Sequence, residues 1–526
     1  MSLPLNPLQK LIQAYQQPDL DFAASAGEAQ IQVSAMASRM AFVYERMRNA
    51  LEYQEVHLIR KNAIERTLKR RLIGRVKPSE LAPELLSELI RGRYLPDNMI
   101  PEHKVSQVAN ILNKYFYLFN RLPLYLQGKE RAQAYRWLLG IAAVEIDHCL
   151  ISPEKAQALA EYMYATVAEH ITVDQKIPVQ EKNIQVYLAV HRALLRSDPS
   201  ILRYHLFRYY NDGWYKADRA MVESVAANIK SIKGKVDAHV DHKIGDNLFR
   251  YLKKYTIYYH VTKDIIEKDP ATFIQRLNQP AVIEQEIIDA CTLRYKQAKD
   301  KLGRSAVRAI IYIFITKMLL ALILEIPYDL YLGSAIQYIP LGINIVFHPF
   351  LLFMAALTVR IPAKENTLQV LKGIQTLLTQ GNASQVLIRR VVRRRPVLTA
   401  IFNVVYVAIF ITVFGFIIYL LDRFGFNPLS ISLFILFLTL VSFFGIKLRE
   451  DSKEYIVVRK NETTLGFLID LFSMPVVRAG RWISQKSPKI NVIVFFFDFV
   501  FETPYKSFVH IFEELTKFVR EKKEEL

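Results

Sequence analysis

The feature that most constrains this chain is a long apolar stretch, residues 397–421, that contains no charged side chain. About 20 apolar residues in a helix cross the roughly 30 Å hydrocarbon core of a bilayer. A helix also bonds all its backbone groups internally, which a lipid environment requires. We therefore predict that residues 397–421 span a membrane.

Three further apolar stretches predict spans at residues 307–332, 336–359 and 429–446. The first carries Lys317 and Glu325, and the second carries Asn344 and His348. The last contains few polar side chains beyond serine and threonine. The expected fold class is all-α, with a four-helix transmembrane domain at residues 301–448.

The distribution of charge around these spans predicts their orientation. The loop at 361–396 holds Glu365 as its only acidic residue, whereas Arg423 is the only basic residue of the two opposite loops. Loops rich in lysine and arginine face the cytoplasm, and the N-terminus lacks the pattern of a signal peptide. We expect both termini to be cytoplasmic. The basic residues of the 361–396 loop are Lys364, Lys372, Arg389, Arg390, Arg393, Arg394 and Arg395.

Residues 1–300 predict a large, basic, helical cytoplasmic domain. Residues 29–73 contain no proline or glycine, and their apolar side chains recur every three or four positions, which is typical of a long helix or a coiled-coil arm. Further helical segments follow, without a strand pattern of useful length. The last of them, from about residue 284, is expected to run unbroken into the first span.

The C-terminal tail, residues 449–526, predicts helices of a different kind. Its apolar stretches are short and are interrupted by charged residues and prolines. Aromatic residues recur in it, as in helices that lie in the membrane interface. An interfacial amphipathic tail is the preferred interpretation, and a re-entrant hairpin within 464–503 is the alternative.

The net charge of +19 suits either a nucleic acid or an anionic membrane surface. A domain tethered to a membrane has anionic head groups as its nearest partner, and each basic residue near the surface contributes about 1 kcal/mol. We therefore favour lipid contact, then a protein partner or homo-oligomer, over nucleic acid. The candidate contact residues are Arg60, Lys61, Arg66, Lys69, Arg70, Arg71, Arg389, Arg390, Arg393, Arg394 and Arg395.

The polar residues inside the first two spans are the candidate functional residues. A lysine near the middle of a span costs about 2.5 to 3.5 kcal/mol unless it is paired or hydrated, so Lys317 either marks a pathway or extends to the interface. Glu325 lies two turns away on the same helix, too far for direct pairing. Asn344 and His348, one turn apart, could face Lys317. His348 precedes Pro349, which indicates a kink or, alternatively, a proton relay.

Other patterns do not predict a metal, a cofactor or a catalytic residue. The group of Asp237, His239, Asp241 and His242 lacks the further ligands of a metal site. Glu145 and His148 form half of a di-iron motif without its second half. Phosphate-binding loops and hydrolase motifs are absent from the sequence, which disfavours an ATPase or a familiar hydrolase. The two cysteines, Cys149 and Cys291, form no CxxC motif.

Two segments, HLIRKNAIERTLKRRL at 57–72 and KINVIVFFFDFVFETPYKSFVHIFEELTKFVREKKEE at 489–525, resemble uncharacterised helical multi-pass membrane proteins of small-genome candidate-phyla bacteria. The resemblance implies a bacterial inner-membrane setting and carries no activity.

Three functions remain open. The leading hypothesis is a non-enzymatic inner-membrane protein that scaffolds a partner or organises the membrane through its cytoplasmic domain. The second is an oligomeric channel or transporter lined by Lys317, Asn344 and His348. The third is a membrane enzyme that acts on lipid, which only the predicted interfacial tail supports.

Overall fold

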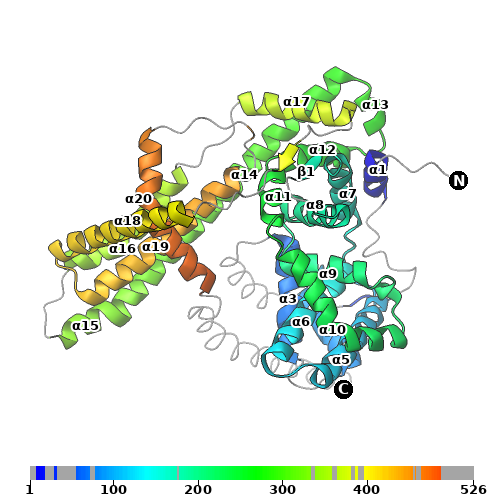
Figure 1. Ribbon diagram of the computed structural model, residues 1–526, viewed down its shortest axis with the longest axis horizontal. Helices are drawn as coiled ribbons and strands as arrows, with labels where there is room; N and C mark the ends of the chain where they lie inside the picture. The colour runs from blue at the N-terminus through cyan, green and yellow to red at the C-terminus, as the bar shows by residue number, and fades with distance from the viewer. Residues whose placement is uncertain are drawn as a thin grey trace, which may run out of the picture. The chain divides into compact units, whose positions relative to one another are not determined.

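The computed structural model describes residues 7–17, 29–31, 33, 55–71, 77–173, 177–332, 338–357, 364–380, 386–388, 396–453, 457 and 464–486. These residues are mainly helical, which confirms the all-α prediction: a helical N-terminal region precedes four long apolar helices and a C-terminal helix (Figure 1). The chain divides into two compact units.

The first unit comprises Met1–Pro280 and takes in Ile374–Arg389 from between the second and third spans. Two three-residue strands, β1 (Ile171–Val173) and β2 (Val386–Ile388), pair in parallel. Its helices are α1 (Pro7–Gln16), α3 (Val56–Arg71), α4 (Pro78–Arg91), α5 (His103–Tyr125), α6 (Gly128–Leu150), α7 (Glu154–Val167), α8 (Val179–Leu194), α9 (Pro199–Tyr210), α10 (Arg219–Val240), α11 (Gly245–Leu252), α12 (Thr256–Lys268) and α13 (Phe273–Leu277), with a 3₁₀ turn at Trp214–Lys216.

The core of this unit is built around α6. Residues 137–147 of α6 are all buried, as in a helix that is surrounded by others. Helices α3, α5, α9 and α10 pack on it. At Gly140 a Cβ atom would lie 2.6 Å from the Ser200 hydroxyl, so glycine permits the close approach of α6 and α9. A second group of helices packs around α8, which contacts α7, α11 and α12. Helix α1 packs on α7.

The start of the predicted 29–73 helix differs from expectation. Residues 29–31 are extended: Gln30 forms an antiparallel bridge with Pro101, and the Ile31 amide donates to the Ile100 carbonyl at 3.0 Å. The helix α3 begins at Val56, and residues 34–54 lie outside the described part. Long-range backbone pairing outweighs local helix propensity here.

The second unit, Ala281–Gly373 and Arg390–Tyr505, holds the four helices that are long and apolar enough to cross a membrane. The candidate spans are Pro280–Tyr331, Tyr338–Leu357, Ala400–Arg423 and Pro428–Lys447, in agreement with the four predicted spans. The elements are α14 (Pro280–Leu320), a π-helical turn (Ala321–Glu325), α15 (Ile326–Tyr331), α16 (Tyr338–Leu357), α17 (Lys364–Gln380, which ends in the first unit), α18 (Pro396–Arg423), α19 (Pro428–Lys453) and α20 (Thr464–Lys486).

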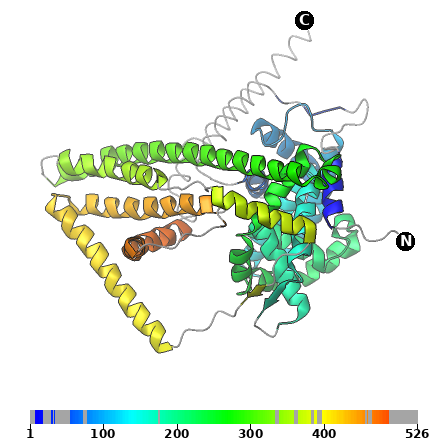
Figure 2. The same ribbon diagram turned by 90° about the horizontal axis from the view of Figure 1, so that it is seen from above.

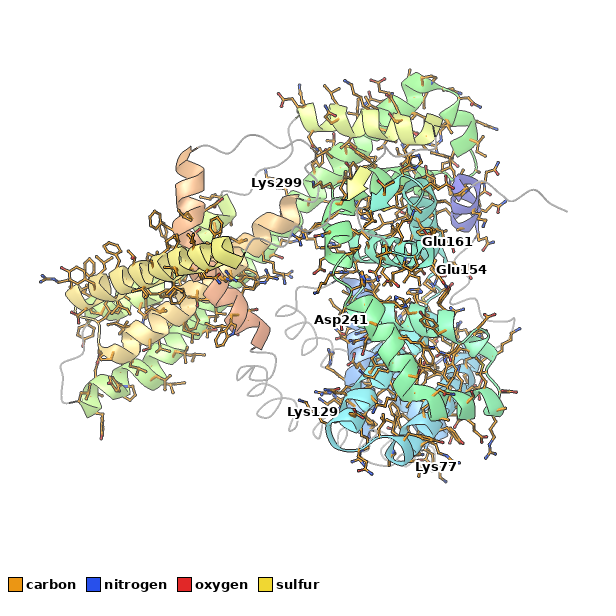
Figure 3. The ribbon with its side chains drawn as sticks, viewed as in Figure 1. Lys77, Lys129, Glu154, Glu161, Asp241 and Lys299 are labelled. Atoms are coloured by element: carbon orange, nitrogen blue, oxygen red, sulfur yellow. The ribbon has the colours of Figure 1, made fainter. Side chains whose placement is uncertain are left out.

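Helix α14 is unbroken for 41 residues, which confirms the expected continuous helix into the first span. It packs with α16 and α19 through Ile313, Leu352 and Val441. Helix α18 joins this bundle through Leu421, near its C-terminal end, and diverges from it elsewhere (Figure 2). The side chains of these helices are mostly carbon, whereas nitrogen and oxygen tips cover the N-terminal helices (Figure 3).

Helix α20 packs on α19 and α18 and crosses α19 steeply (Figure 1). A Cβ atom at Gly480 would lie only 1.9 Å from the Thr439 carbonyl oxygen. Only glycine therefore permits this crossing. The Arg478 guanidinium lies 4.9 Å from the Tyr406 ring centroid. Residues 487–503 of the predicted tail lie outside the described residues, so its interfacial or re-entrant placement stays a prediction.

Candidate functional site

Polar side chains form a buried cluster inside the helix bundle of the second unit. Lys317, Glu325, Asn344 and His348 are each at most 2% exposed. Lys317 lies near the end of α14, Glu325 closes the π-helical turn, and the other two lie one turn apart on α16. Ser430, near the start of α19, completes the cluster. The four polar residues that stand out in the sequence are thus brought together.

The amide of Asn344 links the two charged side chains. The Lys317 ammonium donates to Asn344 Oδ1 at 2.5 Å, and Asn344 Nδ2 donates to Glu325 Oε1 at 2.6 Å. The Ser430 hydroxyl donates to Glu325 Oε2 at 3.1 Å. Lys317 also lies 4.5 Å from the ring centroid of Phe437. Both charges therefore have partners, which is the condition for burying them at a tolerable free-energy cost.

The π-helical turn explains how Lys317 and Glu325 reach one face. In a regular α-helix their eight-residue separation would rotate the two side chains about 80° apart. A π turn accommodates one extra residue. The rotation between Lys317 and Glu325 is therefore that of seven α-helical residues, which is about two full turns. The turn ends two residues before Pro327, which lacks the backbone donor that a regular helix would need.

The network continues toward the end of the bundle at which α18 meets α19. Asn427 Nδ2 donates to Asp329 Oδ1 at 2.7 Å, and Asn427 Oδ1 accepts from the Ser430 amide at 2.7 Å. Asn427 therefore caps the N-terminus of α19 while it holds α15. Asn427 was not among the predicted site residues, although an asparagine followed by proline is a recognisable start of a helix.

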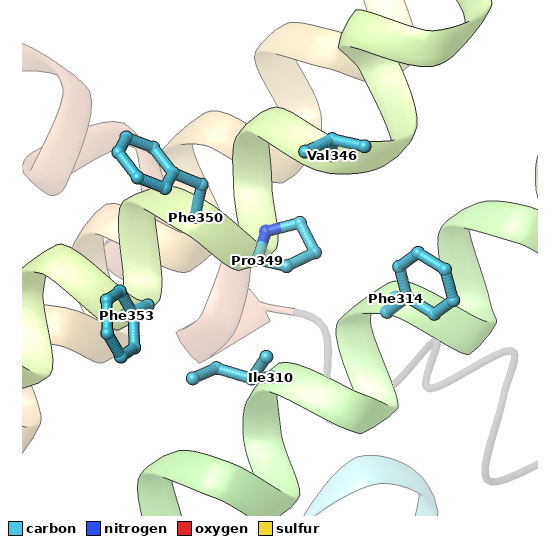
Figure 4. A pocket seen from close by; sticks show the side chains of 6 residues that line it. All are labelled: Ile310, Phe314, Val346, Pro349, Phe350 and Phe353. Atoms are coloured by element: carbon cyan, nitrogen blue, oxygen red, sulfur yellow. The ribbon is translucent and has the colours of Figure 1, made fainter.

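His348 binds α16 to α19 through backbone carbonyls. Its Nε2 lies 3.0 Å from the Phe434 oxygen, and its Nδ1 lies 3.1 Å from the Asn344 oxygen. Pro349 follows within α16, and an open apolar groove of about 240 Å³ lies beside it (Figure 4). The groove is lined by Ile310, Phe314, Val346, Pro349, Phe350 and Phe353. It contains none of the polar residues of the network.

The chemistry of this cluster is that of a closed, charge-compensated packing site. Asn344 contributes an amide, which accepts and donates hydrogen bonds but has no readily exchanged acid proton. Because the amide lies between them, the Lys317 ammonium does not pass a proton directly to the Glu325 carboxylate. The buried network fastens α14, α16 and α19 to one another.

Two basic residues proposed for lipid or partner contact lie inside the first unit instead. Arg60 is 7% exposed and pairs with Asp147 through two bonds, one of them 3.0 Å from Nη2 to Oδ2. Lys61 is 3% exposed and donates to Asp198 at 2.7 Å. Arg60 faces the buried carboxylate of Asp147 on α6, and Lys61 faces the partly buried carboxylate of Asp198 at the start of α9. The prediction that Arg60 and Lys61 contact lipid or a partner at the surface is therefore wrong, because both side chains are buried.

The other basic residues of α3 lie nearer the surface. Lys69, Arg70 and Arg71 are exposed. Arg70 pairs with Glu88 at 2.5 Å, Arg71 pairs with Glu84 at 3.3 Å, and Arg66 donates to the Tyr94 hydroxyl at 3.5 Å. Intramolecular carboxylates thus already compensate part of this charge. The remaining candidates lie outside the described residues: Arg389, Arg390, Arg393, Arg394 and Arg395.

Both metal-like patterns of the sequence take part in hydrogen-bond networks of the first unit. Glu145 accepts from Lys114, Tyr115 and Trp214 at 2.5, 2.6 and 2.8 Å. Asp237 accepts from several side chains, including Arg203 at 2.9 Å. Within the described residues no three histidine, cysteine or acidic side chains are grouped so that they could hold a metal ion.

A cluster of three histidines in the first unit was not anticipated. The His205 ring centroid lies 4.6 Å from that of His191 and 6.0 Å from that of His148. Burial lowers the pKa of His148 to about 3 and that of His205 to about 4, and it lowers the pKa of His191 well below its ordinary value. The three residues come from α6, α8 and α9, so only the tertiary packing reveals the group.

Comparison of the chain with protein-family models, curated proteins and solved structures finds no match in any of the three.

Proposed function

We propose that this chain is a bacterial inner-membrane protein with a scaffolding or membrane-organising role. In this proposal the N-terminal helical unit lies in the cytoplasm, both termini are cytoplasmic, and the unit binds a protein partner and anionic lipid. The four candidate spans supply the anchor. The closed, charge-compensated network between α14, α16 and α19 favours a stable anchor over a pathway.

The observation that carries the proposal is an exposed aromatic surface at the ends of α8 and α9. Val179 is 71% exposed and Tyr209 is 55% exposed, and Gln180, beside Val179, donates to the Tyr209 hydroxyl at 3.0 Å. Tyr210 and Arg208 are exposed beside them. Tyrosine and arginine are the residue types that dominate binding at protein interfaces. A protein partner is therefore the occupant that this surface suits best.

The surface is also held in place before binding. The Tyr210 hydroxyl lies 2.5 Å from His239 Nε2, and the two rings are stacked. His239 Nδ1 in turn lies 2.9 Å from a Glu181 carboxylate oxygen. A side chain that is already ordered loses less conformational entropy on association. This chain of contacts thus supports a binding role for Tyr210.

A photo-crosslinking residue at position 209 tests the proposal in native membranes. We expect one or a few proteins to be captured in stoichiometric amounts. The matched control is the same crosslinker at Tyr125, which is 45% exposed at the end of α5. Equal capture at both positions, or no capture at 209, would contradict the proposed partner surface.

One observation favours a second function, that of an oligomeric channel or transporter. Lys317, Glu325 and Asn344 are joined in a single network, and π-helical turns such as that at 321–325 often occur at functional sites. If this function holds, protein in liposomes should conduct a solute, and Lys317→Leu should abolish the flux. Flux that is unchanged in the mutant would exclude this pathway.

A further inference from the structure

The part of α14 that precedes the first apolar segment is strongly basic. Asp300 is the only acidic residue between positions 296 and 308, and no charged residue occurs from Ala309 to Thr316. The basic side chains are Lys296, Lys299, Lys301, Arg304 and Arg308, and all of them are exposed (Lys299 is labelled in Figure 3). A continuous helix thus passes directly from a charged surface into an apolar segment.

Three of these side chains share one face of α14. Lys301, Arg304 and Arg308 are spaced by three and four residues, which places them in one row along the helix. The neighbouring Gly303 has open space around it. Tyr312 follows Arg308 by one turn, and aromatic residues of this kind favour the membrane interface.

The distance of each charge from the apolar segment decides which of them matter. At 1.5 Å per residue, Arg304 lies about 6 Å from Arg308 along the helix, whereas Lys296 lies about 18 Å from it. The Debye length at physiological salt is about 8 Å. Arg304 and Arg308 therefore remain within reach of a charged membrane surface, and Lys296 is largely screened from it.

We infer that Arg304 and Arg308, which share one face of α14 with Lys301, bind the anionic head groups of phospholipids at this end of the first span. The inference rests on the proposed membrane placement and names its lipid contact. Guanidinium groups donate paired hydrogen bonds that match phosphate oxygens. The apolar segment that continues from the same helix places those oxygens beside the arginines, so charge complementarity and continuity both indicate a lipid.

Native mass spectrometry of the full chain tests this inference. The protein is reconstituted in vesicles of equal parts phosphatidylglycerol and phosphatidylcholine, and the ratio of the two lipids that remain bound is measured. Each charge near the surface is worth about fivefold in association. We expect Arg304→Gln/Arg308→Gln to reduce the preference for phosphatidylglycerol by 10- to 25-fold, and Arg304→Lys/Arg308→Lys to retain most of it.

The matched control is Lys296→Gln, which removes the same charge from the same helix beyond the screening length. It should change the preference less than twofold. A wild-type preference that survives the double glutamine variant, or that falls equally in Lys296→Gln, would overturn the inference. Because the assay contains no protein partner, failure of the crosslinking experiment at Tyr209 would leave its outcome unaffected.

Discussion

Mild acid should destabilise the first unit through its buried histidine cluster. The pKa values of His148 and His205 lie at about 3 and about 4 in the folded protein, below the ordinary value of 6.5. At pH values between the lowered pKa of each ring and 6.5, the unfolded chain therefore binds more protons than the folded one. The stability that these neutral rings confer is complete above pH 6.5 and is lost as the pH falls.

The size of this loss follows from the linkage relation. At pH 5 each ring would bind a proton readily when unfolded and hardly at all when folded, which is worth about 2 kcal/mol per ring. Both rings are only partly buried by accessible surface, so solvent screening reduces this to about 1 to 2 kcal/mol each. Together they should lower the local stability by about 2 to 4 kcal/mol between pH 7.5 and pH 5.

Amide hydrogen exchange in lipid nanodiscs measures this quantity directly, because it gives the free energy of opening for individual segments. Amides of α8 and α9 should lose protection at pH 5, after correction for intrinsic exchange rates. His205→Phe preserves an aromatic ring at the site but cannot take up a proton, so it should remove about a third of the pH dependence, since His148 and His191 remain. Protection that is independent of pH, or an identical pH dependence in the variant, would refute the reasoning.

Three further changes test the buried contacts of the full chain in detergent, two by unfolding and one by protease cleavage. Asp147→Ala leaves Arg60 buried without its carboxylate and should cost about 3 to 5 kcal/mol, whereas replacing both residues with apolar ones should restore most of the stability. Gly480→Leu should undock α20 and expose it to protease, because overpacking costs about 1 to 3 kcal/mol; unchanged cleavage would argue against the crossing. Lys317→Leu should destabilise the bundle by about 3 to 5 kcal/mol, and adding Glu325→Gln should recover much of this loss; additive losses would contradict the network.

The apolar helices illustrate what can be predicted locally. A helix that is to span lipid must be long, apolar and internally hydrogen-bonded, so the sequence alone identifies a candidate span such as that at residues 397–421. The polar residues within the candidate spans were predictable for the same reason, since a charged residue such as Lys317 stands out in an apolar stretch. The hydrogen-bonded link between Lys317 and Glu325 was not predictable, because it depends on Asn344 from another helix and on the π-helical turn.

Surface and core charges illustrate the opposite case. By sequence, Arg60 and Arg70 belong to one basic patch, yet one pairs with a buried carboxylate and the other lies at the surface. Whether a charged side chain on a helix faces water depends on which neighbouring helix packs against that face. The residues that decide this, such as Asp147 for Arg60, lie far away in the sequence.

The helical class, the four candidate spans and the polar residues within them are thus predictable from the sequence, because they follow from local hydropathy and periodicity. Which polar groups meet depends on tertiary packing. It joined Lys317 to Glu325 through Asn344, gathered three histidines from three helices and turned residues 29–31 into an extended segment. Each of these depends on contacts between distant segments, for which local periodicity carries no signal.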